Sequence, residues 1–324
     1  MPPCRPRVIA VTGAGGFLGG AVLAAWQNHP QISSIRALFC RKSQVPEGLS
    51  EKVDVHVGDL SRPEVAEHLV DGAESVLHFA NRGFPLDPVA VPGDTLIQNI
   101  AISSSLLEAI SKNPQQHLVL ASSGGAIYKP LSPRRPFVET DPVEYRTPYA
   151  LCKLSIENLV QHYSLKRGIS ATILRLTNPF GPGQLGRSRQ GFVGVAFEKI
   201  LSSEKMPIWG DLSTSKDFIY VDDVILALEA CTFRQSPLNG IYNLGTETAT
   251  SLAEALATIE KVTGKRFLSE SMPQRSGDAP WTVVNTAKFR DHSGWKPTLD
   301  FEQACRMMWE HLISMGVDRK SSAA

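Results

Sequence analysis

Three glycines at intervals of three residues follow directly after an apolar stretch near the start of the chain. Val8–Thr12 has the pattern of a short buried strand, Gly13, Gly16 and Gly19 come next, and a helical pattern follows. A turn that bends tightly and brings its backbone close to a pyrophosphate at a helix N-terminus needs residues without a Cβ. A flexible loop would explain the glycines alone. Their position between a strand and a helix instead predicts the first βαβ unit of a dinucleotide-binding fold.

The same region resembles a signal peptide or a membrane span at first sight, because Val8–Trp26 contains no charged residue. Its glycines cluster in the middle, where such a segment should be most helical, so a strand, a turn and a helix explain it better. The five cysteines are odd in number, widely spaced and without a CxxC pair. They predict no disulfide framework and no metal site, and they suit a reducing compartment. We therefore expect a soluble, cytoplasmic protein.

Length and charge narrow the class of protein further. The chain has 324 residues, of which 42% are apolar, and 33 basic residues face 32 acidic ones. This length is enough for about two units of ordinary size, and the apolar content is enough for a core. The formal net charge of +1 gives no electrostatic basis for binding nucleic acid, since binders of polyanions carry strongly basic domains or faces.

Apolar runs and amphipathic stretches alternate through the first 176 residues. This alternation predicts an α/β fold: a Rossmann-type doubly wound parallel sheet with a smaller, interleaved C-terminal substrate domain. We assign residues 1–178 to the dinucleotide-binding domain, with a return segment at about 215–245, and residues 179–214 and 246–324 to the substrate domain. The expected strands are Val8–Thr12, Ile35–Phe39, Val53–Val57, Ser75–Phe79, His117–Ala121, Ala171–Leu176 and a late Gly240–Leu244; the expected helices are Thr95–Ser111, Pro148–Lys166, Gly191–Ser203 and Ser251–Thr263.

The end of the second expected strand bears on which dinucleotide binds. No carboxylate stands there to accept hydrogen bonds from the adenosine ribose; Arg41 and Lys42 follow Cys40 instead. Cations at this place can pair with a 2′-phosphate, which favours NADP over NAD, although a solvated basic turn is the alternative. Asp59, after the third strand, is placed to bond the adenine edge.

Tyr149 and Lys153 form the most informative pair in the sequence. Thr147 can cap a helix and Pro148 suits its first turn, so the tyrosine and the lysine would lie one turn apart on the same helix face. A phenol with its ordinary pKa near ~10 is a poor base at neutral pH. We expect the neighbouring ammonium to lower that pKa and make proton exchange with a sugar hydroxyl feasible. An ordinary amphipathic helix with a surface lysine is the alternative.

Taken together, these residues resemble the extended short-chain dehydrogenase/reductase family, and in particular nucleotide-sugar 4-epimerases of the UDP-glucose/UDP-galactose type. The resemblance runs through nearly the whole chain. The segments that carry it are Thr12–Gly19, Leu77–Ala80, Asn99, Ser122–Tyr128 with Tyr149 and Lys153, Leu174–Pro182, Ile208–Asp211, Lys216–Val224, Arg275–Asp278 and Gly294–Pro297.

The resemblance also implies a role for individual residues. The implied catalytic residues are Tyr149, Lys153 and Ser123. The cofactor would be bound by Gly13, Gly16, Phe17, Leu18, Gly19, Arg41, Lys42, Asp59, Leu60, Phe79, Ala80, Asn99 and Lys153. The substrate, a nucleotide sugar that we expect to be UDP-linked, would be bound by Asn178, Lys216, Arg275 and Asp278.

The sequence departs from the family pattern at three places. Many members carry a serine or threonine at one of two positions that are Gly124 and Ala126 here, which leaves Ser123 as the nearest hydroxyl. Lys216 stands where an arginine usually grips the diphosphate, so the charge is kept and the bidentate fork is lost. Lys129 stands where glycine is usual. We expect slow catalysis or an unusual substrate from these departures.

The reaction that the resemblance implies is inversion of C4 of the sugar through transient oxidation, on a tightly bound nicotinamide cofactor. A 4,6-dehydratase is disfavoured, because Gly124-Gly125 occupy the place of its Asp-Glu pair. An NADP-dependent reductase of a keto-sugar or other carbonyl is the main alternative, and a non-catalytic nucleotide-binding protein on the same fold is the second. We also expect a homodimer, and we expect Asp222-Asp223 to cap a helix.

Overall fold

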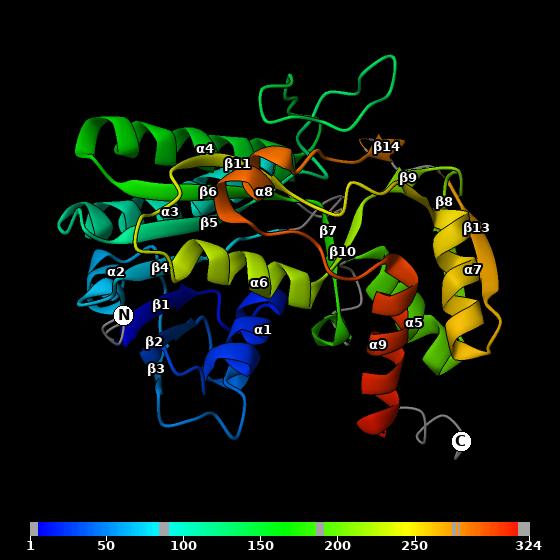
Figure 1. Ribbon diagram of the computed structural model, residues 1–324, viewed down its shortest axis with the longest axis horizontal. Helices are drawn as coiled ribbons and strands as arrows, with labels where there is room; N and C mark the ends of the chain where they lie inside the picture. The colour runs from blue at the N-terminus through cyan, green and yellow to red at the C-terminus, as the bar shows by residue number, and fades with distance from the viewer. Residues whose placement is uncertain (1–5, 84–90, 186–190, 274–276, 278, 317–324) are drawn as a thin grey trace.

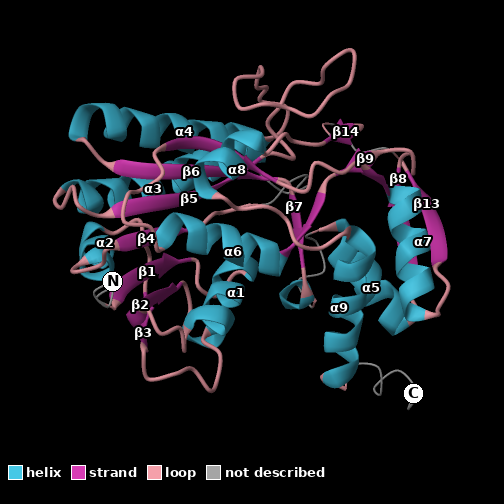
Figure 2. Ribbon diagram, in the orientation of Figure 1, coloured by secondary structure: helices cyan, strands magenta, loops and turns pink. Residues whose placement is uncertain are grey.

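The computed structural model describes residues 6–83, 91–185, 191–273, 277 and 279–316. Its centre is a parallel sheet of seven strands in the order β11-β6-β5-β4-β1-β2-β3 (Figures 1 and 2). The strands are β1 (Arg7–Thr12), β2 (Ile32–Phe39), β3 (Val53–Val57), β4 (Ser75–His78), β5 (His117–Ser123), β6 (Ser170–Leu176) and β11 (Gly240–Leu244). The predicted doubly wound α/β fold is confirmed, and the late strand does return to the sheet, beside β6.

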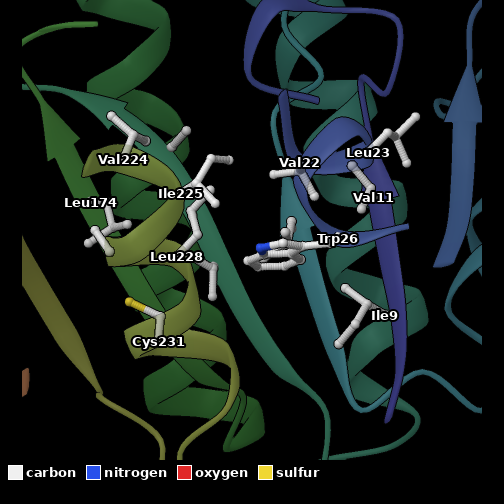
Figure 3. Close-up of a cluster of buried hydrophobic side chains, with 14 of the residues drawn as sticks. Ile9, Val11, Val22, Leu23, Trp26, Leu174, Val224, Ile225, Leu228 and Cys231 are labelled. Carbon is white, nitrogen blue, oxygen red and sulfur yellow. The ribbon is translucent and has the colours of Figure 1, made fainter. Parts of the chain in front are cut away.

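Helices cover both faces of this sheet, because its central strands are apolar on both sides. On one face, α1 (Phe17–Trp26) and α6 (Val221–Thr232) pack against β1 and β6. Figure 3 shows this layer, in which Trp26 of α1 lies between the sheet and the α6 side chains Ile225 and Leu228. The other face is covered by α2 (Pro63–Val70), α3 (Pro92–Ser111) and α4 (Pro148–Arg167).

A second apolar core lies beside the carboxyl ends of the sheet strands (Figure 1). It is built by α5 (Phe192–Ser202), α7 (Leu252–Thr263) and α9 (Phe301–Ser314), with β8 (Lys205–Trp209) paired to β13 (Leu268–Met272). The remaining elements are η1 (Lys42–Gln44), β7 (Asn178–Phe180), η2 (Pro182–Gln184), β9 (Ser215–Lys216), β10 (Phe218–Tyr220), β12 (Thr250–Ser251), β14 (Trp281–Thr282) and α8 (Ala287–Ser293). The apolar face of α9 is buried in this core, through Met308 and Leu312 among others.

The helix that carries the expected acid–base pair has well-defined ends. Thr147 is the N-cap of α4, where its hydroxyl accepts a hydrogen bond from the Ala150 amide at 3.1 Å, and Pro148 occupies the first turn. Gly168 ends the helix in the left-handed conformation, with φ of 70°. Both ends match the preferences of helix termini, so the sequence itself determines where Tyr149 and Lys153 lie on the helix.

The expected role of Asp222-Asp223 as a cap is wrong. The N-cap of α6 is Tyr220, and both aspartates lie inside the first helical turn. The buried Asp223 carboxylate accepts hydrogen bonds from the Thr298 amide at 2.9 Å and from its hydroxyl at 2.6 Å. The side chain thus links α6 to the segment that leads into α9, a contact across more than seventy residues that local spacing does not predict.

None of the helices in the described ranges is both long and apolar enough to cross a membrane.

Candidate active site

A cleft of about 850 Å³ opens at the carboxyl ends of the sheet strands. The ends of β1, β2, β4, β5 and β6 line one side of it, and residues of α5, β8 and β9 line the other. Ligands of open α/β sheets bind at this edge, and the volume lies in the upper part of the range for small-molecule sites. The lining includes Gly13, Gly16, Phe17, Leu18, Gly19, Arg41, Asp59, Leu60, Phe79, Ala80, Ser123, Tyr149, Lys153, Asn178 and Lys216.

The glycine turn has the form that a pyrophosphate site requires. Gly13 has φ of +68°, and a Cβ there would lie 2.7 Å from the Ala80 amide nitrogen. A Cβ on Gly19 would lie 2.3 Å from the Gly13 carbonyl oxygen. The N-cap of α1 is Gly16, which provides no side chain to satisfy the first amides of the helix. The positive end of α1 therefore faces the cleft with amide donors available, and the residues present fit a dinucleotide.

Thr12 holds the two strand ends that flank this turn together. Its hydroxyl accepts hydrogen bonds from the amides of Phe79 at 3.1 Å and Ala80 at 3.2 Å, and lies 2.8 Å from Nδ1 of His78. The β1 end and the β4 end are thereby fixed relative to each other. Phe79 and Ala80 line the cleft as a result of this arrangement.

At the end of β2, Arg41 lines the cleft, whereas Lys42 lies in η1 and is not among the lining residues. Arg82, which is not among the residues predicted from the sequence, lines the same part of the cleft, and its Nη2 lies 3.9 Å from the Cys40 sulfur. Asp59 also lines the cleft; hydrogen bonds from the Ser61 amide and hydroxyl lower the pKa of its carboxyl. No carboxylate of β2 itself faces this region in the described part of the cleft.

Asn99 does not line the cleft. Its carbonyl oxygen accepts a hydrogen bond from the Arg82 amide at 2.9 Å, and its amide donates to the carbonyl oxygens of Arg82 and Thr95. The side chain is buried in α3, where it fixes the backbone of Arg82 and contacts the Cys152 thiol.

Tyr149, Lys153 and Ser123 meet at one point of the cleft. Lys153 Nζ donates to the Ala121 carbonyl oxygen at 2.9 Å and lies 5.6 Å from the centroid of the Tyr149 ring. The Ser123 hydroxyl is a hydrogen-bond partner of the phenol. Helix α4 and the end of β5 together supply the three groups, because α4 packs along β5.

The pKa of Tyr149 differs from the expectation that the neighbouring Lys153 would lower it. Burial raises the pKa of Tyr149 to about 12, and the hydrogen bond with Ser123 only partly opposes this rise. Burial lowers the pKa of Lys153 to about 8, against the opposing effect of Glu157. The expectation that the ammonium lowers the pKa of the phenol is therefore wrong for the protein alone, because loss of solvent raises it. At neutral pH the phenol is neutral and the lysine is mostly charged.

The structure explains why position 124 carries no side chain. A Cβ on Gly124 would lie 2.8 Å from the Arg175 carbonyl oxygen and 3.0 Å from Cγ1 of Val284. Strand β6 thus occupies the space that a serine at this position would need. Gly125 and Ala126 line the cleft without a hydroxyl, so Ser123 is the hydroxyl nearest the phenol on this strand end.

The far end of the cleft contains the expected substrate residues that the structure describes. The Asn178 side-chain amide donates to the Asp217 carbonyl oxygen at 2.9 Å, and Lys216 Nζ donates to the Ala279 carbonyl oxygen at 2.9 Å. Both side chains line the cleft. Arg275 and Asp278 lie outside the described residues.

Two further polar side chains line this end, and they are not among the residues predicted from the sequence. Thr177 and Gln184 are buried, and the Thr177 hydroxyl and the Gln184 carbonyl oxygen find no hydrogen-bond partner among the described residues. Buried polar atoms of this kind normally have a partner, so they are suited to contact a polar ligand. Thr177 directly precedes the expected Asn178, but no motif in the sequence distinguishes Gln184.

The fold and the site together define a dinucleotide-binding α/β protein whose tyrosine and lysine face the cofactor cleft. The sequence model of the family described as "NAD dependent epimerase/dehydratase family" matches residues 9–245. The chain belongs to this family, and the family resemblance inferred from the sequence is confirmed.

Individual relatives are similar along nearly their whole length. A protein of Methanocaldococcus jannaschii named putative UDP-glucose 4-epimerase is 28% identical, over 92% of this chain and 96% of the relative. The structure of UDP-glucose 4-epimerase with UDP-glucose from Thermotoga maritima has a TM-score of 0.86 at 26% identity, covering 95% of this chain and 99% of that one. The Thermus thermophilus UDP-glucose 4-epimerase in complex with NAD has a TM-score of 0.81 at 27% identity, covering 94% and 99%.

Proposed function

We propose that this protein is a nucleotide-sugar 4-epimerase that inverts C4 of a UDP-hexose through a transient 4-keto intermediate. The observation that carries the proposal is the meeting of Tyr149, Lys153 and Ser123 inside a cleft that fits a dinucleotide. Similarity to enzymes named UDP-glucose 4-epimerase supports it.

The three residues have separate roles in this proposal. Tyr149 accepts the proton of the sugar 4-hydroxyl and later returns it, while Ser123 holds the phenol oxygen and the reacting hydroxyl in line. Lys153 places a positive charge next to the phenol and so stabilises the phenolate while the proton is away. A nicotinamide cofactor held at the turn of Gly13 and Gly16 would supply the hydride acceptor and donor for C4, and in its oxidised form would add to the positive charge that favours the phenolate.

Burial of Tyr149 has a functional consequence within this proposal. A phenol with a pKa of about 12 keeps its proton when the cleft lacks additional positive charge. Proton removal from the sugar is then coupled to the presence of the oxidised cofactor and the charged Lys153. Tyr149 would thus become a base only when further positive charge is brought next to it.

The other end of the cleft would hold the nucleotide. We propose that Asn178, Lys216, Arg275 and Asp278 bind the UDP portion, and that the unpartnered atoms of Thr177 and Gln184 receive polar groups of the same ligand. A lysine at position 216 gives one point charge in place of an arginine fork, so diphosphate binding should be weaker and more dependent on salt.

The test is incubation of the purified protein with UDP-glucose, UDP-galactose and their N-acetylated, dTDP- and GDP-linked counterparts, with products resolved by NMR. Inversion at C4 without net change in the cofactor's redox state is the expected result. Net oxidation or reduction of the sugar, or loss of water from it, would contradict the proposal.

For the cofactor, we propose that the adenosine end of the cleft accepts a 2′-phosphate and so favours NADP over NAD. Arg41 and Arg82 line this end, and Lys42 follows in η1. If the bound dinucleotide is NADP, a reductase of a keto-sugar or other carbonyl becomes the main alternative function, because enzymes that consume a reductant in each turnover commonly use NADPH. Mass analysis of the dinucleotide released from the purified protein identifies it. Retained dinucleotide supports the epimerase, whereas readily exchanged dinucleotide supports the reductase.

A homodimer and a cytoplasmic location also remain proposals. Cys152, Cys231 and Cys305 are buried free thiols, which supports a reducing environment. The buried face of α9 is covered by its own chain, whereas Met307 and Ile313 of the same helix are exposed. Light scattering of the purified protein decides its oligomeric state.

A further inference from the structure

Three successive residues at the end of β5 contact three residues of α4 that lie one turn apart. The Ser123 hydroxyl bonds the Tyr149 phenol, and the Ala121 carbonyl oxygen accepts from Lys153. The Ser122 hydroxyl donates to a carboxylate oxygen of Glu157. Glu157 follows Lys153 by four residues, so it extends the face of α4 on which the tyrosine and the lysine lie. This carboxylate has no role in the reaction described so far.

Glu157 belongs to a buried ion pair. Arg175 of β6 donates from Nη2 to Glu157 Oε2 at 2.7 Å and from Nε to both carboxylate oxygens at 3.1 and 3.2 Å. Only 6% of the arginine side chain and 2% of the glutamate side chain are exposed. The guanidinium is also fixed on its other side, since Nη1 donates to the Tyr128 hydroxyl at 2.9 Å and to the Glu139 carbonyl oxygen at 3.0 Å.

Such a pair is a poor way to gain stability. Removing two charges from water is costly, and well-packed apolar residues in their place are often as stable or more stable. Its place in the molecule suggests a different use. Three hydrogen bonds from Arg175 of β6 hold the carboxylate in place. Lys153, one turn earlier on α4, is close enough for the carboxylate to raise its pKa.

We propose that Glu157 is a positioning residue for Lys153: its carboxylate, fixed by Arg175 and Ser122, keeps the lysine charged and directed toward Tyr149. The functional consequence rests on the role proposed above for Lys153. Burial lowers the pKa of Lys153, and Glu157 has the largest effect that opposes this fall; with that opposition included, the pKa is about 8. Without that carboxylate the lysine would lose its proton near neutral pH, and the phenolate would lose its neighbouring charge.

Among the other groups around Lys153, Cys152 also raises the pKa of the lysine, but by less than Glu157 does. On α4 the lysine faces Tyr149 and Cys152, on β4 it faces His78, and on β5 it bonds the Ala121 carbonyl oxygen. His78 is fully buried with a pKa lowered by burial to about 3, so it stays neutral and supplies no negative charge.

The test compares Glu157→Gln with Tyr128→Phe as a matched control. Tyr128→Phe removes a buried hydrogen bond to the same guanidinium, from the side that does not face Lys153. The protein as purified is labelled with [ε-¹³C]lysine, and its NMR titration is followed, with the Lys153 signal identified by its absence in Lys153→Arg. We expect the pKa of Lys153 to fall by about one pH unit or more in Glu157→Gln and to stay unchanged in Tyr128→Phe.

The pH dependence of turnover gives the second readout. With a lysine pKa of about 8, roughly half of Lys153 is charged at pH 8, and a fall of one unit would leave about a tenth. Turnover of Glu157→Gln should therefore be about fivefold lower than wild type at pH 8 and changed less than about twofold at pH 6. A purely structural role for Glu157 would lower turnover equally at both values.

Glu157→Gln leaves the Arg175 charge buried without its partner and can prevent folding for that reason alone. The double variant Glu157→Gln/Arg175→Met removes that charge, and it decides the question if the single variant does not fold. A Lys153 titration equal to wild type in the folded variant overturns the proposal. The titration does not depend on enzymatic turnover, so its result is independent of the proposed function. If the proposed function were wrong, the wild-type protein would invert no nucleotide sugar.

Discussion

Gly124→Ala should destabilise the protein, whereas the same substitution one residue later should not. A Cβ at position 124 would lie 2.8 Å from the Arg175 carbonyl oxygen and 3.0 Å from Val284 Cγ1. The first of these atoms is backbone in the middle of the sheet, so no side-chain rotation relieves the contact. At Gly125 the nearest atoms to a Cβ belong to Asn178 and Thr177, at 3.5 to 3.6 Å, which is ordinary van der Waals contact.

The expected magnitudes follow from two opposing effects. Replacing glycine by alanine stabilises by about 0.4–1 kcal/mol where the native conformation allows it, since the unfolded chain loses freedom. Overpacking a well-packed site costs about 1–3 kcal/mol. We therefore expect Gly125→Ala to be neutral or slightly stabilising and Gly124→Ala to be less stable than it by about 2 kcal/mol, which is roughly 3 °C in Tm for a chain of this size.

The pair is measured by thermal and urea unfolding, followed by tryptophan fluorescence and circular dichroism. Gly124→Ser, which introduces the hydroxyl that many family members carry, should be destabilised in the same way and should not gain turnover, because the shift it forces acts on the strand that holds Arg175. Equal Tm values for Gly124→Ala and Gly125→Ala, or a faster Gly124→Ser enzyme, would refute the reasoning.

Two other predictions concern stability. Thr12→Val removes the oxygen that accepts hydrogen bonds from the amides of Phe79 and Ala80. Leaving these donors unpaired should lower the free energy of unfolding by about 2–4 kcal/mol, measured by urea unfolding, and should weaken dinucleotide binding, measured by fluorescence titration. An unchanged affinity would show that Thr12 does not shape the cleft. Acid should unfold the protein early, because burial holds the pKa of His78 at about 3 and that of His117 at about 4, below the value of 6.5 in the unfolded chain. The folded state keeps both rings neutral, so the stability they contribute is complete above pH 6.5 and is lost as the pH falls toward 4 and then 3, by up to about 1.4 kcal/mol per pH unit for each ring. Urea midpoints from pH 7 to 4.5 measure this, His117→Asn should flatten the curve, and a midpoint independent of pH would contradict it.

Much of the sheet could be predicted from the sequence because its strands are short, apolar and separated by recognisable turns. Val53–Val57 and Gly240–Leu244 have the expected bounds, and the other strands of the sheet differ by one to three residues at their ends. The pair β8–β13 was not predicted. Leu268–Met272 is exposed and mostly polar, and it is a strand only because it pairs with Lys205–Trp209 more than sixty residues earlier.

The residues of the site likewise fall into those that local sequence patterns predict and those that only the fold brings together. Helix periodicity alone places Tyr149 and Lys153 on one face, and the glycine spacing alone predicts the phosphate turn. The carbonyl oxygen that leaves no room for a side chain at Gly124 and the guanidinium that pairs with Glu157 both belong to Arg175 of β6. Local sequence patterns do not predict that β6 lies beside β5 in the sheet. Likewise, Asn99 bonds a backbone segment that only the fold brings near. Local patterns reveal which residues carry chemistry, but not which neighbours fix them.

The central claim is that C4 is oxidised and reduced again by a hydride that never leaves the site, with Tyr149 moving the proton. The most direct test uses UDP-glucose deuterated at C4, with NMR of the UDP-galactose formed by wild type and by Tyr149→Phe. The account predicts that wild type keeps the deuterium at C4 of the inverted product, and that Tyr149→Phe, folded and retaining its dinucleotide, turns over about 10²–10⁴ times more slowly. Loss of the deuterium to solvent, or equal turnover by the two proteins, would contradict it.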